Sequence, residues 1–209
     1  HDGSVTVWTS TQGTFHAQKQ LSAILKIPMR KLNVVPMEVG GAFGGKIYAL
    51  LEPLAIMLSQ RSGRPVRIVM SREEVLKATG PSSPSYITIK TGVREDGHLR
   101  ACYAKMVYDA GAFPGAPVQA AAMIGFGAYK ADNVKSLGYD VVTNKPRVQA
   151  YRAPGGTAVA FAVESHMDAV AKSVNIDPLQ FRKINSVSEG DLMPNGNRYN
   201  RIGLSKMID

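Results

Sequence analysis

Hydrophobic and polar residues alternate with a period of two over residues 86–93, the pattern of a half-buried β-strand. Asp96 and Gly97 follow, and this dipeptide favours a tight hairpin turn. The alternation resumes over residues 98–108. The sequence therefore predicts an antiparallel hairpin in the middle of the chain.

Shorter apolar patterns predict the remaining elements. We predict further strands at residues 5–9, 32–39, 66–70, 137–142 and 146–151. We predict helices at about 15–26, 46–60, 157–174 and 178–184, and a helical turn capped by Ser71. Residues 109–127 predict a long loop that contains a helical piece at 118–124. This order of elements predicts an α+β fold, with mixed sheets packed against helices in two layers.

The predicted helices differ in their apolar faces. In the helix at 15–26, the apolar stripe is formed by Phe15, Leu21, Ile24 and Leu25. The helix at 46–60 is apolar on most sides, so we expect it to be buried and to end at Gly63. The helix at 157–174 carries its apolar residues near helical spacing, at Val159, Val163, Met167, Val170 and Val174.

The composition, 44% hydrophobic and 20% charged residues, is that of an ordinary globular protein. No apolar run is long enough to span a membrane. The net charge of +9 would permit nucleic-acid binding, but the basic residues are scattered and not interleaved with aromatic ones, so we expect no nucleic-acid partner. Cys102 is the single cysteine, which excludes internal disulfides and cysteine-ligated clusters held by this chain alone. We expect a core role for Cys102 and a cytoplasmic protein.

Both ends of the chain lack the features of a complete protein. It starts at His1 and Asp2, without an initiator methionine or a basic and apolar leader. Residues 186–209 are polar and rich in turn formers. We therefore expect residues 1–209 to form one partial domain that is truncated at both ends.

A glycine-rich segment at residues 39–46 is the strongest candidate for chemistry. Its glycines are Gly40, Gly41, Gly44 and Gly45, and they enclose Ala42 and Phe43. Glycine tolerates positive φ and has no Cβ, so backbone N–H groups can come close to an anionic or oxo-bearing ligand. A helix that starts directly after the loop would add further N–H donors. We interpret the segment as a cofactor-binding loop, with a structural turn as the alternative.

The same segment also fits part of the phosphate-binding P-loop pattern. Gly40, Gly45 and Lys46 have the required spacing, but the next residue is Ile47 instead of the serine or threonine that holds Mg²⁺. Phe43 would also crowd a phosphate. A P-loop-like phosphate-binding protein is therefore the weaker interpretation.

Three segments lie at the ends of predicted strands and before predicted helices: residues 9–12, 40–46 and 150–156. Such ends gather at one edge of a sheet, where ligands bind. In this order, the set resembles the molybdopterin-binding subunit of the xanthine dehydrogenase and aldehyde oxidase family of molybdenum hydroxylases. That family carries a Ser/Thr-Gln segment, a Gly-Gly-x-Phe-Gly-Gly-Lys loop and a Tyr/Phe-Arg-x-x-Gly loop.

The resemblance implies a role for each of these positions. Gln12 would hydrogen-bond an oxo ligand of molybdenum through its side-chain amide, and Phe43 with Gly44 would lie over the metal. Arg152 with Ala153 would present backbone amide to the molybdenum ligands. Gln12, Phe43 and Arg152 would thus surround a metal that has no direct protein ligand. The residues that would allow close approach to the cofactor are Gly40, Gly41 and Gly45, with Ala42 between them. A helix-capping role for Gln12 and a surface ion pair for Arg152 are the alternatives.

Three departures from members of the family bear on the substrate. Purine-oxidising members carry a glutamate where this chain has Ile47, and an arginine in the region that matches residues 118–124, where this chain has none. Carbon monoxide dehydrogenases carry a cysteine in the loop where Ala153 and Pro154 stand here. The resemblance therefore implies an aldehyde or an aromatic N-heterocycle as the substrate.

The catalytic base implied by the resemblance is a glutamate near the end of the subunit, beyond Asp209. Glu164 and Asp168 are interpreted as solvated carboxylates or partners of a helix dipole. Glu52 lies inside the predicted apolar helix, where a buried carboxylate would require a partner. His16 and His166 lie in predicted helices and are interpreted as structural.

The resemblance implies a whole enzyme that hydroxylates carbon with oxygen from water. Its cofactors would be molybdopterin, as the mononucleotide or the cytosine dinucleotide, with [2Fe–2S] clusters and FAD on partner subunits or domains. The partners would be the rest of the molybdenum subunit, an iron–sulfur subunit and an FAD subunit, and this chain alone would be inactive. The alternative is a non-enzymatic interaction domain that kept the fold without the cofactor.

Overall fold

The computed structural model describes residues 3–208 and divides into two compact units. Unit 1 is the chain up to Pro81 together with Gln149–Arg152, and unit 2 is Ser82–Val148 together with the chain from Ala153. His1, Asp2 and Asp209, which carry the expectations about the chain ends, lie outside the described residues. One partial domain over residues 1–209 stays a prediction.

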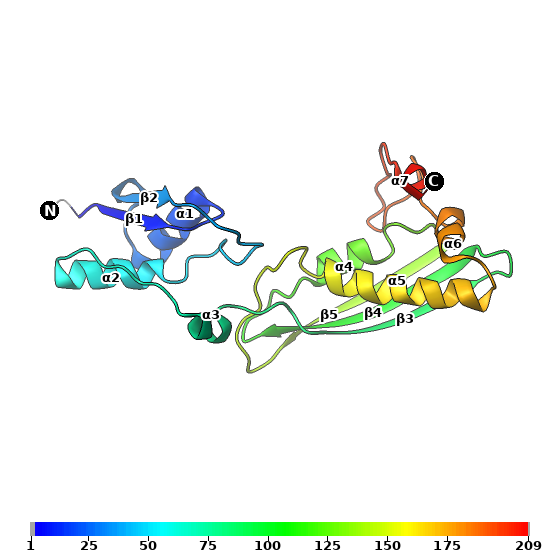
Figure 1. Ribbon diagram of the computed structural model, residues 1–209, viewed down its shortest axis with the longest axis horizontal. Coiled ribbons are helices and arrows are strands. Elements are labelled where there is room, and N and C mark those ends of the chain that lie inside the picture. Colours follow the sequence, from blue (N-terminus) through cyan, green and yellow to red (C-terminus); the bar gives the residue numbers. More distant parts are fainter. Residues whose placement is uncertain (1–2, 209) are drawn as a thin grey trace. The chain divides into compact units, whose positions relative to one another are not determined.

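Unit 1 is built on a two-stranded parallel sheet with a helical crossover (Figure 1). Its elements are β1 (Val5–Thr9), α1 (Thr14–Leu25), the 3₁₀ turn η1 (Met29–Lys31), β2 (Leu32–Pro36), α2 (Glu52–Ser62) and α3 (Arg72–Ala78). The core consists of Val7, Ala17, Leu21, Leu32, Val34 and Ile56. Because β1 and β2 run parallel, their carboxyl ends lie at one edge, with Thr9 opposite Pro36.

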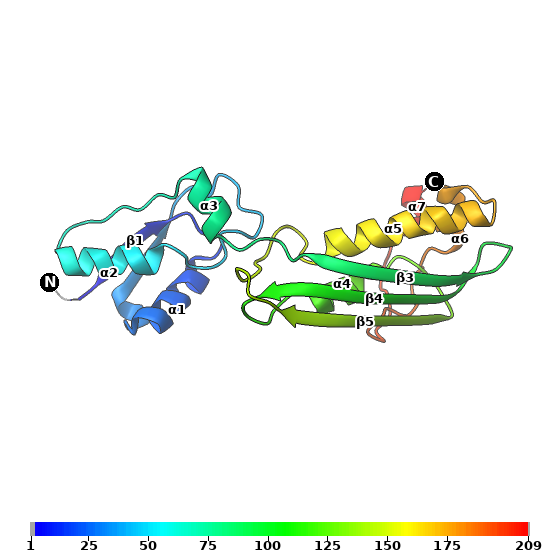
Figure 2. The same cartoon turned by 90° about the horizontal axis from the view of Figure 1, so that it is seen from below.

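Unit 2 is a three-stranded mixed sheet with helices on one face. Its elements are β3 (Ser85–Val93), β4 (Leu99–Gly111), α4 (Val118–Gly125), β5 (Asn133–Val142), α5 (Gly156–Ser173), α6 (Pro178–Ile184) and α7 (Leu204–Ile208). The strand order is β3-β4-β5, antiparallel and then parallel, as Figure 2 shows. The core joins β4 to α5 and contains Cys102, Ala104, Met106, Tyr108, Val159, Val163 and Met167. The described chain is thus of the predicted α+β class.

Local sequence signals are confirmed where they are strongest. The hairpin turn forms with Gly97 at φ +86°, and its N–H donates to the Arg94 carbonyl at 2.9 Å. Ser71 and Glu74 form a reciprocal capping box on α3. Gly63 ends α2 in the left-handed region. Burial raises the pKa of the Cys102 thiol to about 11, consistent with a core residue.

Two predicted strands are wrong. Residues 66–70 have strand-like composition but form no strand, and Val69 is 70% exposed. Residues 146–151 are also irregular: within unit 2 Val148 N–H donates to Ala110 O, and within unit 1 Gln149 N–H donates to Pro81 O. A strand exists only where a neighbour pairs with it continuously, which a single-sequence pattern does not reveal.

Helix predictions in unit 1 need three corrections. α2 begins at Glu52, so residues 46–51 are not helical as predicted. Pro53 in the first turn fits a helix start here, because its missing N–H has no intrahelical role. The preceding strand β2 is also shorter than predicted, because it ends at Pro36 and not at residue 39. α2 is not buried, since Ile56 is its single buried residue while Leu54 and Met57 are exposed. In α1, Ala17 and Leu21 are buried, whereas Phe15 and Ile24 are exposed.

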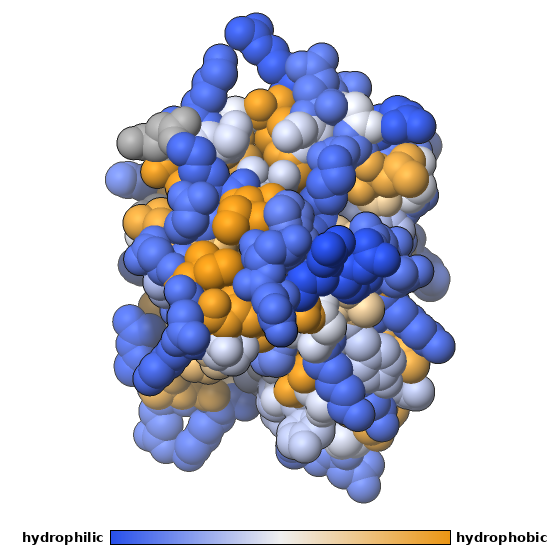
Figure 3. Space-filling model, turned by 90° about the vertical axis from the view of Figure 1, so that its right-hand side faces the viewer, coloured by the Kyte–Doolittle hydropathy of each residue, from blue (hydrophilic) through white to orange (hydrophobic). Residues whose placement is uncertain are grey.

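The end of unit 2 that carries α6 and α7 presents apolar groups among polar ones (Figure 3). Leu179 of α6 and Met207 of α7 are both exposed. None of the described helices is long and apolar enough to cross a membrane.

Candidate functional site

The glycine-rich loop follows β2 and lies beside the segment that follows β1. Met37 N–H donates to Thr9 O at 2.9 Å, and Gln12 N–H donates to Lys46 O at 2.9 Å. Ser10 Oγ donates to Glu38 O at 3.1 Å and is also close to Val39 O. The two strand ends therefore bring the first two predicted loops together, as expected for the carboxyl edge of a parallel pair.

Lys46, at the end of this loop, forms hydrogen bonds with residues at and before its beginning. Its ammonium donates to Ser10 Oγ at 2.9 Å and to Val39 O at 2.5 Å. In a P-loop, the lysine must reach the phosphates instead. Because this ammonium is occupied and no helix begins at Ile47, the geometry argues against the phosphate-binding alternative.

Gln12 has an orientation that favours donation from its amide nitrogen. Its Oε1 accepts the N–H of Gly44 at 3.0 Å and the N–H of Lys46 at 3.2 Å. Among the described residues Nε2 has no hydrogen-bond partner, so the two N–H groups of the carboxamide stay free to donate. The helix-capping alternative is not observed, because the N-cap of α1 is Gly13 and has no side-chain cap.

The first half of the loop offers a row of backbone donors. Within the described residues, the N–H groups of Gly40, Gly41, Ala42 and Phe43 make no hydrogen bond to the protein. We call these four N–H groups the donor row. Gly40, Gly41 and Phe43 have φ of +62°, +99° and +52°. Successive N–H groups in left-handed and turn conformations form concave anion-binding surfaces. The donor set is neutral and suits an oxo-bearing group.

The third predicted loop contacts the second. Arg152 N–H donates to Phe43 O at 2.8 Å, and the Arg152 guanidinium lies 6.0 Å from the centre of the Phe43 ring. A Cβ at Gly44 would lie 2.6 Å from Ala150 O, so only glycine permits this approach. Phe43 and Arg152 both have positive φ, and such strain often collects at functional sites.

Two backbone N–H groups of the predicted site are bonded within unit 1 itself. The N–H of Gly44 donates to Gln12, and the N–H of Arg152 donates to Phe43, so neither is available to a ligand. Both instead fix the shape of the donor row. Ala153 is the first residue of unit 2 after the loop and has φ +53°. Arg152 forms no ion pair within the described residues, which removes the surface-pair alternative there.

The remaining carboxylates are engaged in structural contacts. Glu52 begins α2, accepts Thr9 Oγ1 at 2.5 Å and accepts Leu50 N–H at 2.8 Å. Glu164 and Asp168 are not simply solvated as predicted, because Arg182 donates to both at 2.8 and 2.7 Å. No group of His, Cys, Asp and Glu in the described chain could hold a metal ion.

Both candidate histidines have structural surroundings. His16 is exposed, lies 2.9 Å from Gln20 Nε2 and meets the Tyr48 ring edge-on at 5.8 Å. His166 lies 3.0 Å from Thr91 Oγ1 in unit 2, and burial lowers its pKa.

Comparison with known proteins decides the family. A family model described as the molybdopterin cofactor-binding domain matches residues 1–186. The chain belongs to this family. It is 35% identical to a probable xanthine dehydrogenase subunit of Bacillus subtilis over 92% of this chain. It is 29% identical to the nicotinate dehydrogenase large molybdopterin subunit of Eubacterium barkeri over 100% of this chain.

Solved structures in the family share the fold. The aldehyde oxidoreductase from Desulfovibrio gigas matches all of this chain with a TM-score of 0.93 and 27% identity. The chain spans 26% of the Bacillus subtilis relative, 50% of the Eubacterium barkeri relative and 23% of the solved chain. These matches confirm the predicted family and fold class, and molybdopterin as the cofactor of the family.

Proposed function

We propose that the edge formed by Gln12, the loop from Gly40 to Lys46, and Arg152 holds the molybdenum end of the molybdopterin cofactor. The observation that carries this proposal is the orientation of the Gln12 carboxamide, whose oxygen is bound by the Gly44 and Lys46 N–H groups while its nitrogen is free. The adjacent unpaired N–H groups from Gly40 to Phe43 supply further neutral donors.

In this proposal the chain contributes binding and orientation. When bound, the cofactor supplies a two-electron oxidation in which oxygen from water is added to a substrate carbon. The Gln12 amide nitrogen would donate a hydrogen bond to the oxo-bearing group, and the N–H groups from Gly40 to Phe43 would stabilise its negative charge. Phe43, which is 58% exposed, forms an apolar wall that limits the approach of water. Rigid placement follows from the contacts of Lys46 and Arg152.

We propose an aldehyde or an aromatic N-heterocycle as the substrate of the whole enzyme. Ile47 in place of glutamate, and the lack of arginine in residues 118–124, remove the charged groups expected for a purine. Relatives named for nicotinate and for aldehydes support both remaining classes. We also propose a cytoplasmic complex in which electrons pass to iron–sulfur clusters and FAD on partner chains.

Metal analysis of the native complex tests this function. We expect about one molybdenum per copy of the chain by mass spectrometry, together with the fluorescence of an oxidised pterin. A folded, intact complex that contains neither would contradict the proposal.

Replacing Gln12 by alanine tests the residue that carries the argument. A hydrogen bond to a charged group contributes about 1.5–3 kcal/mol, so we expect turnover per bound molybdenum to fall about 10- to 100-fold. The matched control is Gln60→Ala, because Gln60 is exposed on α2 and should leave turnover unchanged. Equal turnover of both variants would show that Gln12 does not act near the metal.

A further inference from the structure

One face of the sheet in unit 2 is not covered by any element described in that unit. The even-numbered residues of β4 from Cys102 to Tyr108 point toward α4 and α5 and are buried. The odd-numbered residues Ala101, Tyr103, Lys105 and Val107 point the other way. We call these residues and their pairing partners on β3 and β5 the open face.

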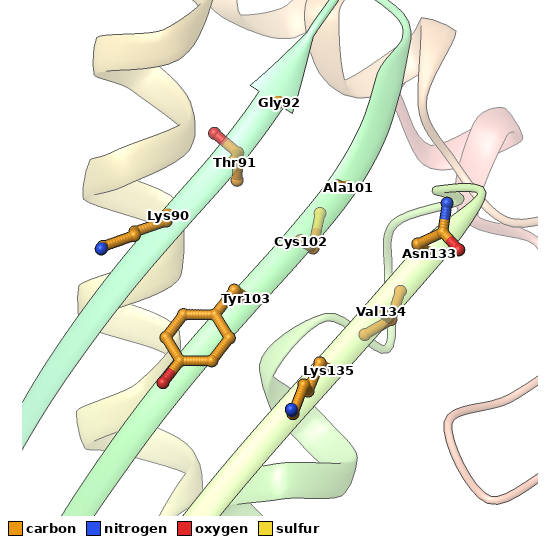
Figure 4. A pocket seen from close by; sticks show the side chains of 9 residues that line it. All are labelled: Lys90, Thr91, Gly92, Ala101, Cys102, Tyr103, Asn133, Val134 and Lys135. Atoms are coloured by element: carbon orange, nitrogen blue, oxygen red, sulfur yellow. The ribbon is translucent and has the colours of Figure 1, made fainter.

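The open face combines aromatic residues with lysines. Tyr103 pairs with Lys90 on one side and Lys135 on the other, so the three side chains form a row across the strands (Figure 4). In a second row Tyr86 and Tyr139 flank Val107, and they are 72% and 47% exposed. Tyrosine beside aliphatic residues is typical of the centre of protein interfaces.

The open face has a depression next to the first row, where the side chains are short. Gly92, Ala101 and Asn133 pair across the strands and leave an open depression of about 530 Å³, bordered by Lys90, Tyr103 and Lys135 (Figure 4). Ammonium, phenol and carboxamide groups are all hydrogen-bond donors, so the border of the depression suits a carboxylate.

The positive charge of this face is not balanced locally. Within the described chain, Lys90, Lys105 and Lys135 form no ion pair, and Lys105 instead lies 5.4 Å from the Tyr139 ring centre. The odd-numbered positions from Ala101 to Val107 and their pairing partners include no aspartate or glutamate. Exposed cations beside apolar surface select a partner that carries the opposite charge.

We propose that the open face docks an acidic surface of a separate polypeptide, one that presents carboxylates beside apolar side chains. A second copy of this chain does not fit, because a two-fold contact would place these lysines against each other. Nucleic acid fits less well, because Val107 and Leu137 separate the tyrosines that would have to stack bases. The proposal is independent of the cofactor site in unit 1.

Zero-length carbodiimide cross-linking of the purified native complex tests this surface directly. The reagent joins an ammonium to a carboxylate only when they touch. We expect Lys90, Lys105 or Lys135 to be joined to aspartate or glutamate of another polypeptide, and exposed Lys172 on α5 not to be joined to the same peptide. Cross-links only to unit 1, only to a second copy, or nuclease-sensitive protection of these lysines would each overturn the proposal.

Reversing the charge of these lysines tests the same proposal by measuring the affinity of assembly. The triple variant Lys90→Glu, Lys105→Glu and Lys135→Glu should weaken assembly about tenfold or more while the thermal unfolding midpoint stays within a few degrees. The matched control reverses Lys19, Lys172 and Lys206, which are exposed elsewhere, and changes the net charge equally. Equal assembly of the two triple variants would overturn the proposal.

Discussion

Replacing Gly44 by alanine is expected to lower the molybdenum and pterin content of the native complex at least about tenfold. The added Cβ would lie 2.6 Å from Ala150 O and 2.9 Å from its carbonyl carbon, on a backbone with φ +98°. Both neighbours are backbone atoms that cannot rotate away. Overpacking of about 1–3 kcal/mol and a left-handed penalty of about 1–2 kcal/mol would therefore act together.

The clash of the added Cβ with Ala150 should disturb two hydrogen bonds of the site. Moving Gly44 away from Ala150 would lengthen the bond from Arg152 N–H to Phe43 O, which measures 2.8 Å. It would also displace the N–H that holds Gln12 Oε1 at 3.0 Å. The donor row and the carboxamide would thus lose their shared geometry.

Gly63→Ala is the matched control for this prediction. Gly63 lies at the end of α2, outside the proposed site, and also has positive φ, at +65°, but nothing lies within 4 Å of a Cβ there. The control carries the backbone penalty without the clash, and we expect it to keep most of its molybdenum. If the two variants lose molybdenum equally, the contact between the loops is not required for binding.

The sequence predicted elements that local signals determine. The hairpin around Gly97, the capping box at Ser71 and the apolar spacing of α5 all depend on residues close together in the chain. It failed where pairing with distant residues decides the outcome. Val69 lies in a strand-like stretch without a pairing strand.

Part of the candidate site was also predictable. Glycines around Phe43, after an apolar run, identify the loop, and the order of the three loops identifies the family. The assignment of each donor was not predictable, because the pattern cannot show that the Gly44 and Arg152 N–H groups bind within the site. The hydrogen bond from the Lys46 ammonium likewise depends on Ser10, which is distant in sequence.

Asn185 carries no signal in the sequence pattern, and its replacement by leucine is expected to destabilise unit 2 by about 3 kcal/mol. Its side chain accepts Leu99 N–H at 2.9 Å and donates to Gly97 O at 2.8 Å and to Phe181 O at 2.9 Å. The residue is 2% exposed, so water cannot replace these bonds. Leucine has a similar volume but leaves the Leu99 N–H and the Gly97 carbonyl unsatisfied, at about 1–3 kcal/mol for each group, while Phe181 O still accepts the backbone N–H of residue 185.

Hydrogen exchange of the Val163 amide, which lies in the core of unit 2 and does not bond to Asn185, measures this effect. A loss of about 3 kcal/mol corresponds to exchange roughly a hundredfold faster when opening is at equilibrium. Asn195→Leu is the matched control, because Asn195 is exposed and accepts one bond, from Asn197 N–H at 3.0 Å. That surface change should alter the free energy of unfolding by about 0.5 kcal/mol at most. Equal exchange in the two variants would mean that the Asn185 bonds do not hold the hairpin turn to α6.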